Sequence, residues 1–171
     1  MSLRMNDAQL SSETSQGVLL TKSGYTTLQA ELEHLTLVKR PEIADRIRES
    51  QQHGEFSEDN SELDEVKFEQ AMVETRIGDL KSIFGGAVIL EEANIPIDHV
   101  GIGSLVTVTD LEVGEEFSIR VVSSVEADPN RDLVSNESPM GTALLCHVVG
   151  EAVTFDTPDG TKKYKVKAIT R

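Results

Sequence analysis

The sequence predicts an α+β protein of two parts, an N-terminal antiparallel coiled-coil hairpin followed by a strand-rich domain with one short helix. In the first half, apolar residues recur at the three- and four-residue spacings of helices. In the second half the apolar pattern alternates with a period of two, which is typical of strands. Only residues 55–59 lie between Gly54 and Asn60, where the two helical segments meet. A connection this short makes the helices antiparallel neighbours.

The composition supports a molecule built from more than one part. Apolar residues make up 38% of the 171 residues and tryptophan is absent, which argues against a single large core. We expect a polar, Ser-rich, disordered lead-in over residues 1–17 and the hairpin over residues 18–86. A linker is expected over residues 87–98, and the strand-rich domain over residues 99–171.

The first helical segment is expected to begin near Leu19, with Thr21 or Ser23 as its N-cap. Its apolar seam consists of Leu28, Leu32, Leu35, Ile43 and Ile47. Pro41 interrupts this seam, and a kink or a break and restart is expected there because proline cannot continue the hydrogen-bond ladder. Gly54 closes the segment in the position that a helix C-cap favours.

The second helix is expected to begin at Asn60 or Ser61 and to end at Gly85 and Gly86. Its residues follow the a/d line of a coiled coil with one polar member: Leu63, Val66, Gln70, Val73, Ile77, Leu80 and Phe84. At 1.5 Å per residue this arm would run roughly 35 to 40 Å. The connection between the helices would therefore lie at the far tip of a narrow rod.

The strand-rich domain is expected to contain two alternating strands, "LVTVTD" and "FSIRVVSSV", in which Phe117, Ile119 and Val121 share one face. The segment "SPMGTALLCHVVG" is expected to form a short helix from Ser138 to Gly150. After it, "AVTFDTPDGTKKYKVKAI" is expected to be a β-hairpin whose turn is carried by residues 158–160.

The charge of the chain restricts its partners. The formal net charge is −14, so phosphate would repel most of the surface, and nonspecific binding to nucleic acid or to an anionic membrane is disfavoured. A partner that offers cations, a bound metal or a basic channel is favoured. The single cysteine, Cys146, cannot form a disulfide framework, and no apolar leader opens the sequence. We therefore expect a soluble cytoplasmic protein without a membrane partner.

Negative charge is concentrated where the two helices meet. The acids there are Glu55, Glu58, Asp59, Glu62, Asp64 and Glu65. The last three are explained as first-turn residues, because a helix N-terminus stabilises negative charge. The first three precede the helix, and oxygen ligands of this kind are those that hard divalent cations take. No complete calcium loop is present, so these acids would complete a site whose other ligands come from elsewhere. A solvated acidic turn is the competing interpretation.

Several segments carry a resemblance to a known family. The run "LTKSGYTTLQAELEHL…RPEIADRI…HGEFSEDNSEL" resembles the N-terminal hairpin of the Gre transcript cleavage factors, the bacterial GreA/GreB family. The segment "SNESPMGTALL" is similar to part of that family's FKBP-like C-terminal domain, and the match runs from about Val18 to Arg171. The resemblance implies an accessory factor that is not itself an enzyme. Such a factor inserts its hairpin into the secondary channel of bacterial RNA polymerase and stimulates Mg²⁺-dependent cleavage of backtracked RNA.

The resemblance also implies roles for the tip residues. Two acids in the family pattern G-D-x-x-E-N help to hold the second Mg²⁺ of the polymerase active site, which the factor does not bind stably alone. By that pattern Glu55 and Glu58 are the candidates for metal binding and catalysis, with Asp59 as the alternative second acid and Asn60 as an orienting group. This chain has Glu for Asp at the first acid and reads E-x-x-E-D-N, with one extra residue. A Gre-like inhibitor that occupies the same channel without stimulating cleavage therefore stays open, as does a plain interaction module.

The same resemblance implies roles for residues away from the tip. Arg40 and Lys67 are the candidates for contact with the RNA 3′ end, against the alternative of solvated helix faces with pairs such as Glu42 with Arg46. The candidates for docking on the rim of the polymerase channel are Asp128, Pro129, Ser138 and Pro139. A plain turn is the alternative at Asp128 and Pro129, and Ser138 is also expected to start a helix. No residue is expected to bind an organic cofactor.

Overall fold

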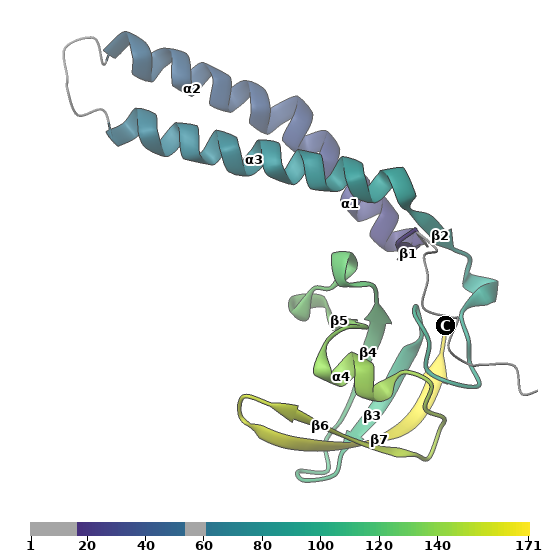
Figure 1. Ribbon diagram of the computed structural model, residues 1–171. Helices are drawn as coiled ribbons and strands as arrows, with labels where there is room; N and C mark the ends of the chain where they lie inside the picture. Colours follow the sequence, from purple (N-terminus) through teal and green to yellow (C-terminus); the bar gives the residue numbers. More distant parts are fainter. Residues whose placement is uncertain (1–16, 54–60) are drawn as a thin grey trace, which may run out of the picture.

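The computed structural model describes residues 17–53 and 61–171 and shows a long helical hairpin that projects from a strand-rich domain (Figure 1). The predicted α+β fold is therefore confirmed. Within the described ranges, no helix has the length and apolar character needed to cross a membrane.

Two short strands close the base of the hairpin. The first element of the described residues is β1, Leu19–Thr21, which pairs in parallel with β2, Val88–Leu90. The first helix therefore starts at Lys22 rather than near Leu19, and Thr21 is its N-cap. Part of the segment expected to be a linker forms β2 instead. Strands of three residues are too short to leave a period in the sequence, which is why neither was predicted.

The first arm runs through α1, Lys22–His34, a π-helical segment, Leu35–Lys39, and α2, Arg40–His53. In the π-helical segment the amide of Arg40 donates to the carbonyl of Leu35, five residues earlier. Pro41 follows at once, and its ring and missing amide are incompatible with a regular α-helical ladder. The interruption predicted at Pro41 is present as this π-helical segment, and the helix continues without a break.

The second arm is α3, Ser61–Gly86, whose bounds agree with the prediction. It runs antiparallel to the first arm (Figure 1). The predicted seam is confirmed by the burial of Val66, Ile77 and Leu80 on α3 and of Leu28 and Ile43 on the opposite arm. Near the base, Tyr25 and Phe84 stack edge to face with ring centroids 5.1 Å apart.

The strand-rich domain is a five-stranded sheet in the order β5-β4-β3-β7-β6. The strands are β3 Leu105–Asp110, β4 Glu116–Val122, β5 Leu133–Ser135, β6 Ala152–Thr157 and β7 Gly160–Thr170. All neighbours are antiparallel except β4 and β5. Thr157 pairs with Gly160, so Pro158 and Asp159 form the predicted turn of the last hairpin.

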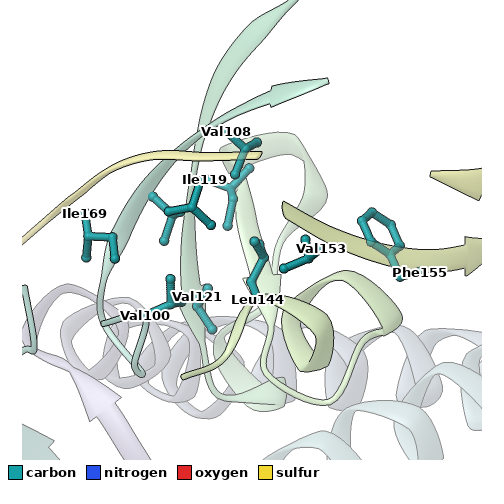
Figure 2. Packing of buried hydrophobic residues seen from close by; sticks show 10 residues of the cluster. Val100, Val108, Ile119, Val121, Leu144, Val153, Phe155 and Ile169 are labelled. Atoms are coloured by element: carbon teal, nitrogen blue, oxygen red, sulfur yellow. The ribbon is translucent and has the colours of Figure 1, made fainter. Parts of the chain in front are cut away.

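The core of this domain lies between the sheet and α4, Pro139–Leu144 (Figure 2). Val108 from β3 and Ile119 and Val121 from β4 point to the same side as Leu144 from the helix. Phe117 is half-buried against this cluster, so the face predicted for β4 is confirmed. The expected end of this strand at Val125 is wrong, because β4 ends at Val122 and Ser124–Glu126 forms a 3-10 turn.

α4 ends at Leu144, so the prediction that it extends to Gly150 is wrong. Leu145 has left the helical conformation, and Cys146 has a positive φ of 66°. The backbone beyond the helix pairs with Val100 instead: the amide of Cys146 donates to the Val100 carbonyl at 2.8 Å, and the Val100 amide donates to the His147 carbonyl at 2.9 Å. These long-range bonds, invisible in the local sequence, replace the last helical turns.

Candidate functional site

The acidic connection joins the two arms of the hairpin. α2 ends at His53 and α3 begins at Ser61, and these helix ends lie at the end of the hairpin farthest from the strand-rich domain (Figure 1). The predicted site residues Glu55, Glu58 and Asp59, with Asn60, lie outside the described residues. The structure therefore shows where the two flanking helices end and begin. The roles predicted for these four residues stay predictions.

The first acids after the connection lie on α3. Glu62, Asp64 and Glu65 are at its N-terminal end, where the positive end of the helix dipole favours carboxylates. Glu62 and Glu65 are exposed. Across residues 17–53 and 61–171, no cluster of three or more His, Cys, Asp or Glu side chains is arranged to hold a metal ion.

The hairpin is well packed close to its far end. Val66, five residues after the start of α3, is only 1% exposed. Ser50, three residues before the end of α2, is buried as well. Buried side chains that interdigitate at crystal-like density resist displacement. The packing of the two arms therefore extends to Ser50 on α2 and Val66 on α3, within two helical turns of the ends of the helices.

Arg40 is engaged by an acid on the opposite arm. Its Nε donates to Glu74 Oε1 and its Nη2 to Glu74 Oε2, each at 2.7 Å. The hydrogen bond from Arg40 lowers the pKa of the Glu74 carboxyl, and the same bond raises the pKa of the guanidinium. This fork-to-fork geometry orients Arg40 across the hairpin, although the residue stays exposed enough for a further phosphate contact.

Two more ion pairs join the arms. Arg46 pairs with Glu69 at 2.5 Å rather than with Glu42, so the predicted intrahelical pair is wrong. Glu42 pairs with Lys39 at 3.4 Å. Near the base, Arg76 forms two hydrogen bonds with the carboxylate of Glu31, at 2.6 and 2.8 Å, and this contact raises the pKa of Arg76.

Sequence spacing did not reveal these cross-arm pairs, whose partners are 23 to 45 residues apart. The apolar seams of the two arms, aligned in antiparallel register, are the one sequence signal that would have suggested these ion pairs.

Lys67 differs from Arg40 in its surroundings. It is exposed on α3, six residues after the first residue of the helix, which is about 9 Å along the axis. No ion pair to Lys67 is formed within the described part of the chain. Its ammonium group is available for an anionic partner near the tip.

The predicted docking residues lie at the two ends of β5, an edge strand of the sheet. Before β5, Asp128 caps a 3-10 turn that starts at Pro129, with its carboxylate accepting from the Asn130 amide at 3.0 Å. After β5, Ser138 caps α4 by accepting from the Gly141 amide at 3.0 Å, and its hydroxyl donates to the Ser135 carbonyl at 2.7 Å.

The structure thus brings the pairs Asp128–Pro129 and Ser138–Pro139 to one edge of the domain, with both prolines exposed. The turn expected at Asp128 and the helix start expected at Ser138 are both present.

This architecture defines a class of proteins in which a small strand-rich domain carries a projecting helical hairpin with an acidic connection. Comparison with family models identifies that class. A transcription elongation factor N-terminal model matches residues 18–89, and a GreA/GreB C-terminal model matches residues 95–171. The chain belongs to the GreA/GreB family of transcription elongation factors.

Individual relatives are similar over nearly the whole chain. Transcription elongation factor GreA of Clostridioides difficile (strain 630) is 46% identical over 159 residues, which cover 93% of this chain and 99% of the relative. The GreA of Alkaliphilus oremlandii (strain OhILAs) is 49% identical over 154 residues, covering 90% and 96% of the two chains. Among solved structures, the GreA factor homolog 1 (Gfh1) protein of Thermus thermophilus is 38% identical, covers 91% of this chain and 99% of its own, and has a TM-score of 0.44.

Proposed function

We propose that this elongation factor inserts its hairpin into the secondary channel of bacterial RNA polymerase and stimulates the polymerase to cleave backtracked RNA. The observation that carries the proposal is the packed helical hairpin, whose two arms end at His53 and begin again at Ser61, on either side of a sequence that contains Glu55, Glu58 and Asp59. The strand-rich domain would dock on the rim of the channel through the β5 edge. The factor would thereby act as an accessory protein in an active site that belongs to its partner.

The donor set of the connection fits Mg²⁺, because carboxylate oxygens are the ligands this ion takes from proteins. In a two-metal site, the ions activate the attacking oxygen and stabilise the leaving oxygen. Glu55, together with Glu58 or Asp59, would hold the second ion with ligands from the polymerase. Their mutual repulsion on the free factor would be relieved only inside the partner, which explains so many acids in one short connection.

The cations of the hairpin would hold the extruded RNA. Lys67 lies closer to the tip than the Arg40–Glu74 pair, since Glu74 is seven residues further along α3. Seven helical residues correspond to roughly 10 Å. The two side chains would therefore contact successive phosphates of the RNA rather than the same one.

A backtracked elongation complex with end-labelled RNA and Mg²⁺ tests the proposal. The intact factor should release a short 3′ RNA fragment, and a Glu55→Gln, Glu58→Gln, Asp59→Asn variant should lose this activity. A Glu62→Gln, Glu65→Gln variant is the control, because it removes neighbouring charges that α3 alone explains, and it should cleave normally. Equal loss in the control would contradict a specific role for the connection.

One sequence feature favours a second candidate, a factor that inhibits the polymerase from the same channel. The connection has Glu rather than Asp as its first acid and one extra residue relative to the family pattern. Displacement of a reacting group by about 1 Å can cost on the order of a hundredfold in rate. In the same assay this candidate predicts no RNA release and slower elongation after NTP addition, with the slowing relieved in the tip variant. A plain interaction module predicts no effect of either kind.

A further inference from the structure

Glu126 is a buried carboxylate at the junction between the hairpin and the strand-rich domain. It is 8% exposed and ends the 3-10 turn Ser124–Glu126. Burial of a carboxylate is unfavourable unless hydrogen bonds or an opposite charge compensate for the lost water. The donors are supplied by the hairpin: the amide of Thr21 donates to Glu126 Oε2 at 3.0 Å, and the Thr21 hydroxyl donates to Oε1.

Thr21 is also the N-cap of α1, because its side-chain oxygen accepts from the Gly24 amide at 3.0 Å. In a capping box, the third residue after the N-cap is Glu or Gln, and its side chain accepts from the N-cap amide. Here that third residue is Gly24, which has no side chain to offer. The amide of Thr21 is satisfied instead by Glu126, 105 residues later in the chain.

Gly24 leaves the space that this carboxylate occupies. A Cβ atom at position 24 would lie 2.0 Å from Glu126 Cδ and 2.2 Å from Oε1, far inside van der Waals contact. The backbone at Gly24 is ordinary α-helix, so conformation does not demand a glycine, and glycine is unfavourable in a helix. The close approach of Glu126 is the physical reason for glycine at this position.

The neighbouring side chain strengthens the contact. Val125, also in the 3-10 turn, packs against the hairpin cluster of Leu20, Leu28 and Leu80. The turn therefore presents a carboxylate to the helix N-terminus and an apolar group to the core of the hairpin base. A negative charge at that position is further stabilised by the positive end of the α1 dipole.

We propose that Glu126 completes the capping box of α1 across the domain boundary and so positions the hairpin relative to the strand-rich domain. Its importance for cleavage rests on the proposed function. α3 has 26 residues, so the arm is about 39 Å long. A rotation of about 10° at the base of such an arm moves its far end by roughly 7 Å. A contact that fixes the base angle therefore decides where the acidic connection is delivered.

Distance measurement between spin labels tests the positioning without a polymerase. One label is attached to the exposed native Cys146 and the other to Phe68→Cys, which is exposed on α3 and lies toward the far end of the arm, where a change of the base angle produces a large displacement. We expect a narrow distance distribution for the parent and a broad one for Glu126→Ala. Gly24→Ala retains the residue Glu126, but its new Cβ occupies the space of the carboxylate. This variant should therefore also broaden the distance distribution. A distribution that stays narrow in both variants, with far-UV circular dichroism unchanged, would overturn the proposal.

The variant Gly24→Glu, Glu126→Ala separates positioning from helix stability. Its new Glu can complete the capping box within α1, so the thermal stability of the hairpin should return while the distance distribution stays broad. A return to the narrow distribution would show that Glu126 acts only by stabilising the helix, and would overturn the proposal.

RNA cleavage provides the functional readout. If loss of the contact leaves about one tenth of the molecules in the productive orientation, the factor concentration for half-maximal cleavage should rise about tenfold in Glu126→Ala. The maximal rate at saturating factor should be unchanged, since the tip is intact. An unchanged half-maximal concentration together with a broad distance distribution would refute the positioning role. Absence of cleavage with the parent factor would contradict the proposed function. It would not affect the test of positioning, because the distance measurement uses no polymerase.

Discussion

At the scale of single residues, Arg40 has two roles that mutation can separate, because its guanidinium is held by Glu74 and is also proposed to contact RNA. The charge swap Arg40→Glu, Glu74→Arg keeps the cross-arm pair but moves the cation to the other helix. We expect thermal denaturation of the swap to match the parent, while Arg40→Glu alone melts earlier because two acids face each other. RNA cleavage should stay reduced in both. Restored cleavage in the swap would assign Arg40 a purely structural role.

The same pair predicts a titration result. The pKa of Glu74 is lowered chiefly by the hydrogen bond from Arg40, so the pair contributes stability above the ordinary carboxyl pKa and loses it as the pH falls through the lowered value. Both groups are exposed, so the contribution is small. Carbon-detected NMR titration should place the Glu74 midpoint below the ordinary range of a glutamate carboxyl, and Arg40→Ala should return it toward that range. A Glu74 titration midpoint that does not change in Arg40→Ala would contradict the pairing.

Residue identities were predictable where chemistry is local. The start of α4 at Ser138 followed from residue type and spacing, and Thr21 was one of two candidate N-caps for α1, beside Ser23; the structure has Ser138 and Thr21 as the caps. The partner of Glu126 was not predictable, because a buried carboxylate and the amide it accepts from are 105 residues apart. Gly24 is the one residue near Thr21 whose type reflects that contact. A glycine in the first turn of a helix does not by itself indicate which group approaches it.

At the scale of elements, the hairpin depends on its apolar seam. Ile77 is 2% exposed on α3, whereas Phe68 on the same helix is 69% exposed. Ile77→Ala should lower the free energy of unfolding by about 2–5 kcal/mol through lost burial and the cavity left behind. Phe68→Ala should change it by less than about 0.5 kcal/mol. Urea titration followed by circular dichroism at 222 nm compares the two, and similar losses in both would refute the seam.

The cap of α4 gives a second element-level prediction, within the surface proposed to dock on the polymerase. Ser138→Ala removes an acceptor for the Gly141 amide and a donor to the Ser135 carbonyl, and should cost about 1 kcal/mol of stability. Ser138→Asp keeps an acceptor at the cap and should cost less. If both variants fold but only Ser138→Ala binds polymerase weakly, Ser138 acts on binding through the helix cap. If both variants bind polymerase equally weakly, Ser138 contacts the polymerase directly.

Periodicity predicted the long elements and missed the short ones. The seam of α3 and the faces of β4 followed from spacing, because each contains several repeats of its period, and the glycines Gly85 and Gly86 marked the end of α3. β1, β2 and β5 have three residues each, and their formation depends on partners elsewhere in the chain. The early end of α4 has the same cause, since its would-be last turns pair with Val100.

At the scale of the whole molecule, the net charge is −14, and the acids gathered in the connection should steer the hairpin toward a basic channel. We therefore expect association with bacterial RNA polymerase to slow by about tenfold or more as salt rises from low to high ionic strength. The tip variant Glu55→Gln, Glu58→Gln, Asp59→Asn has a net charge of −14 + 3 = −11. If the hairpin approaches tip first, this variant should associate more slowly than the parent and with a weaker salt dependence.

The matched control is Glu33→Gln, Glu115→Gln, Asp159→Asn, which gives the same net charge of −14 + 3 = −11 by neutralising exposed acids outside the connection. Stopped-flow association at several salt concentrations compares the three proteins. Because screened charges act over a Debye length of about 10 Å at 0.1 M salt, only acids near the leading end should affect the approach. The control should therefore behave like the parent. Equal slowing in both variants would show that overall charge governs association, and would contradict tip-first insertion.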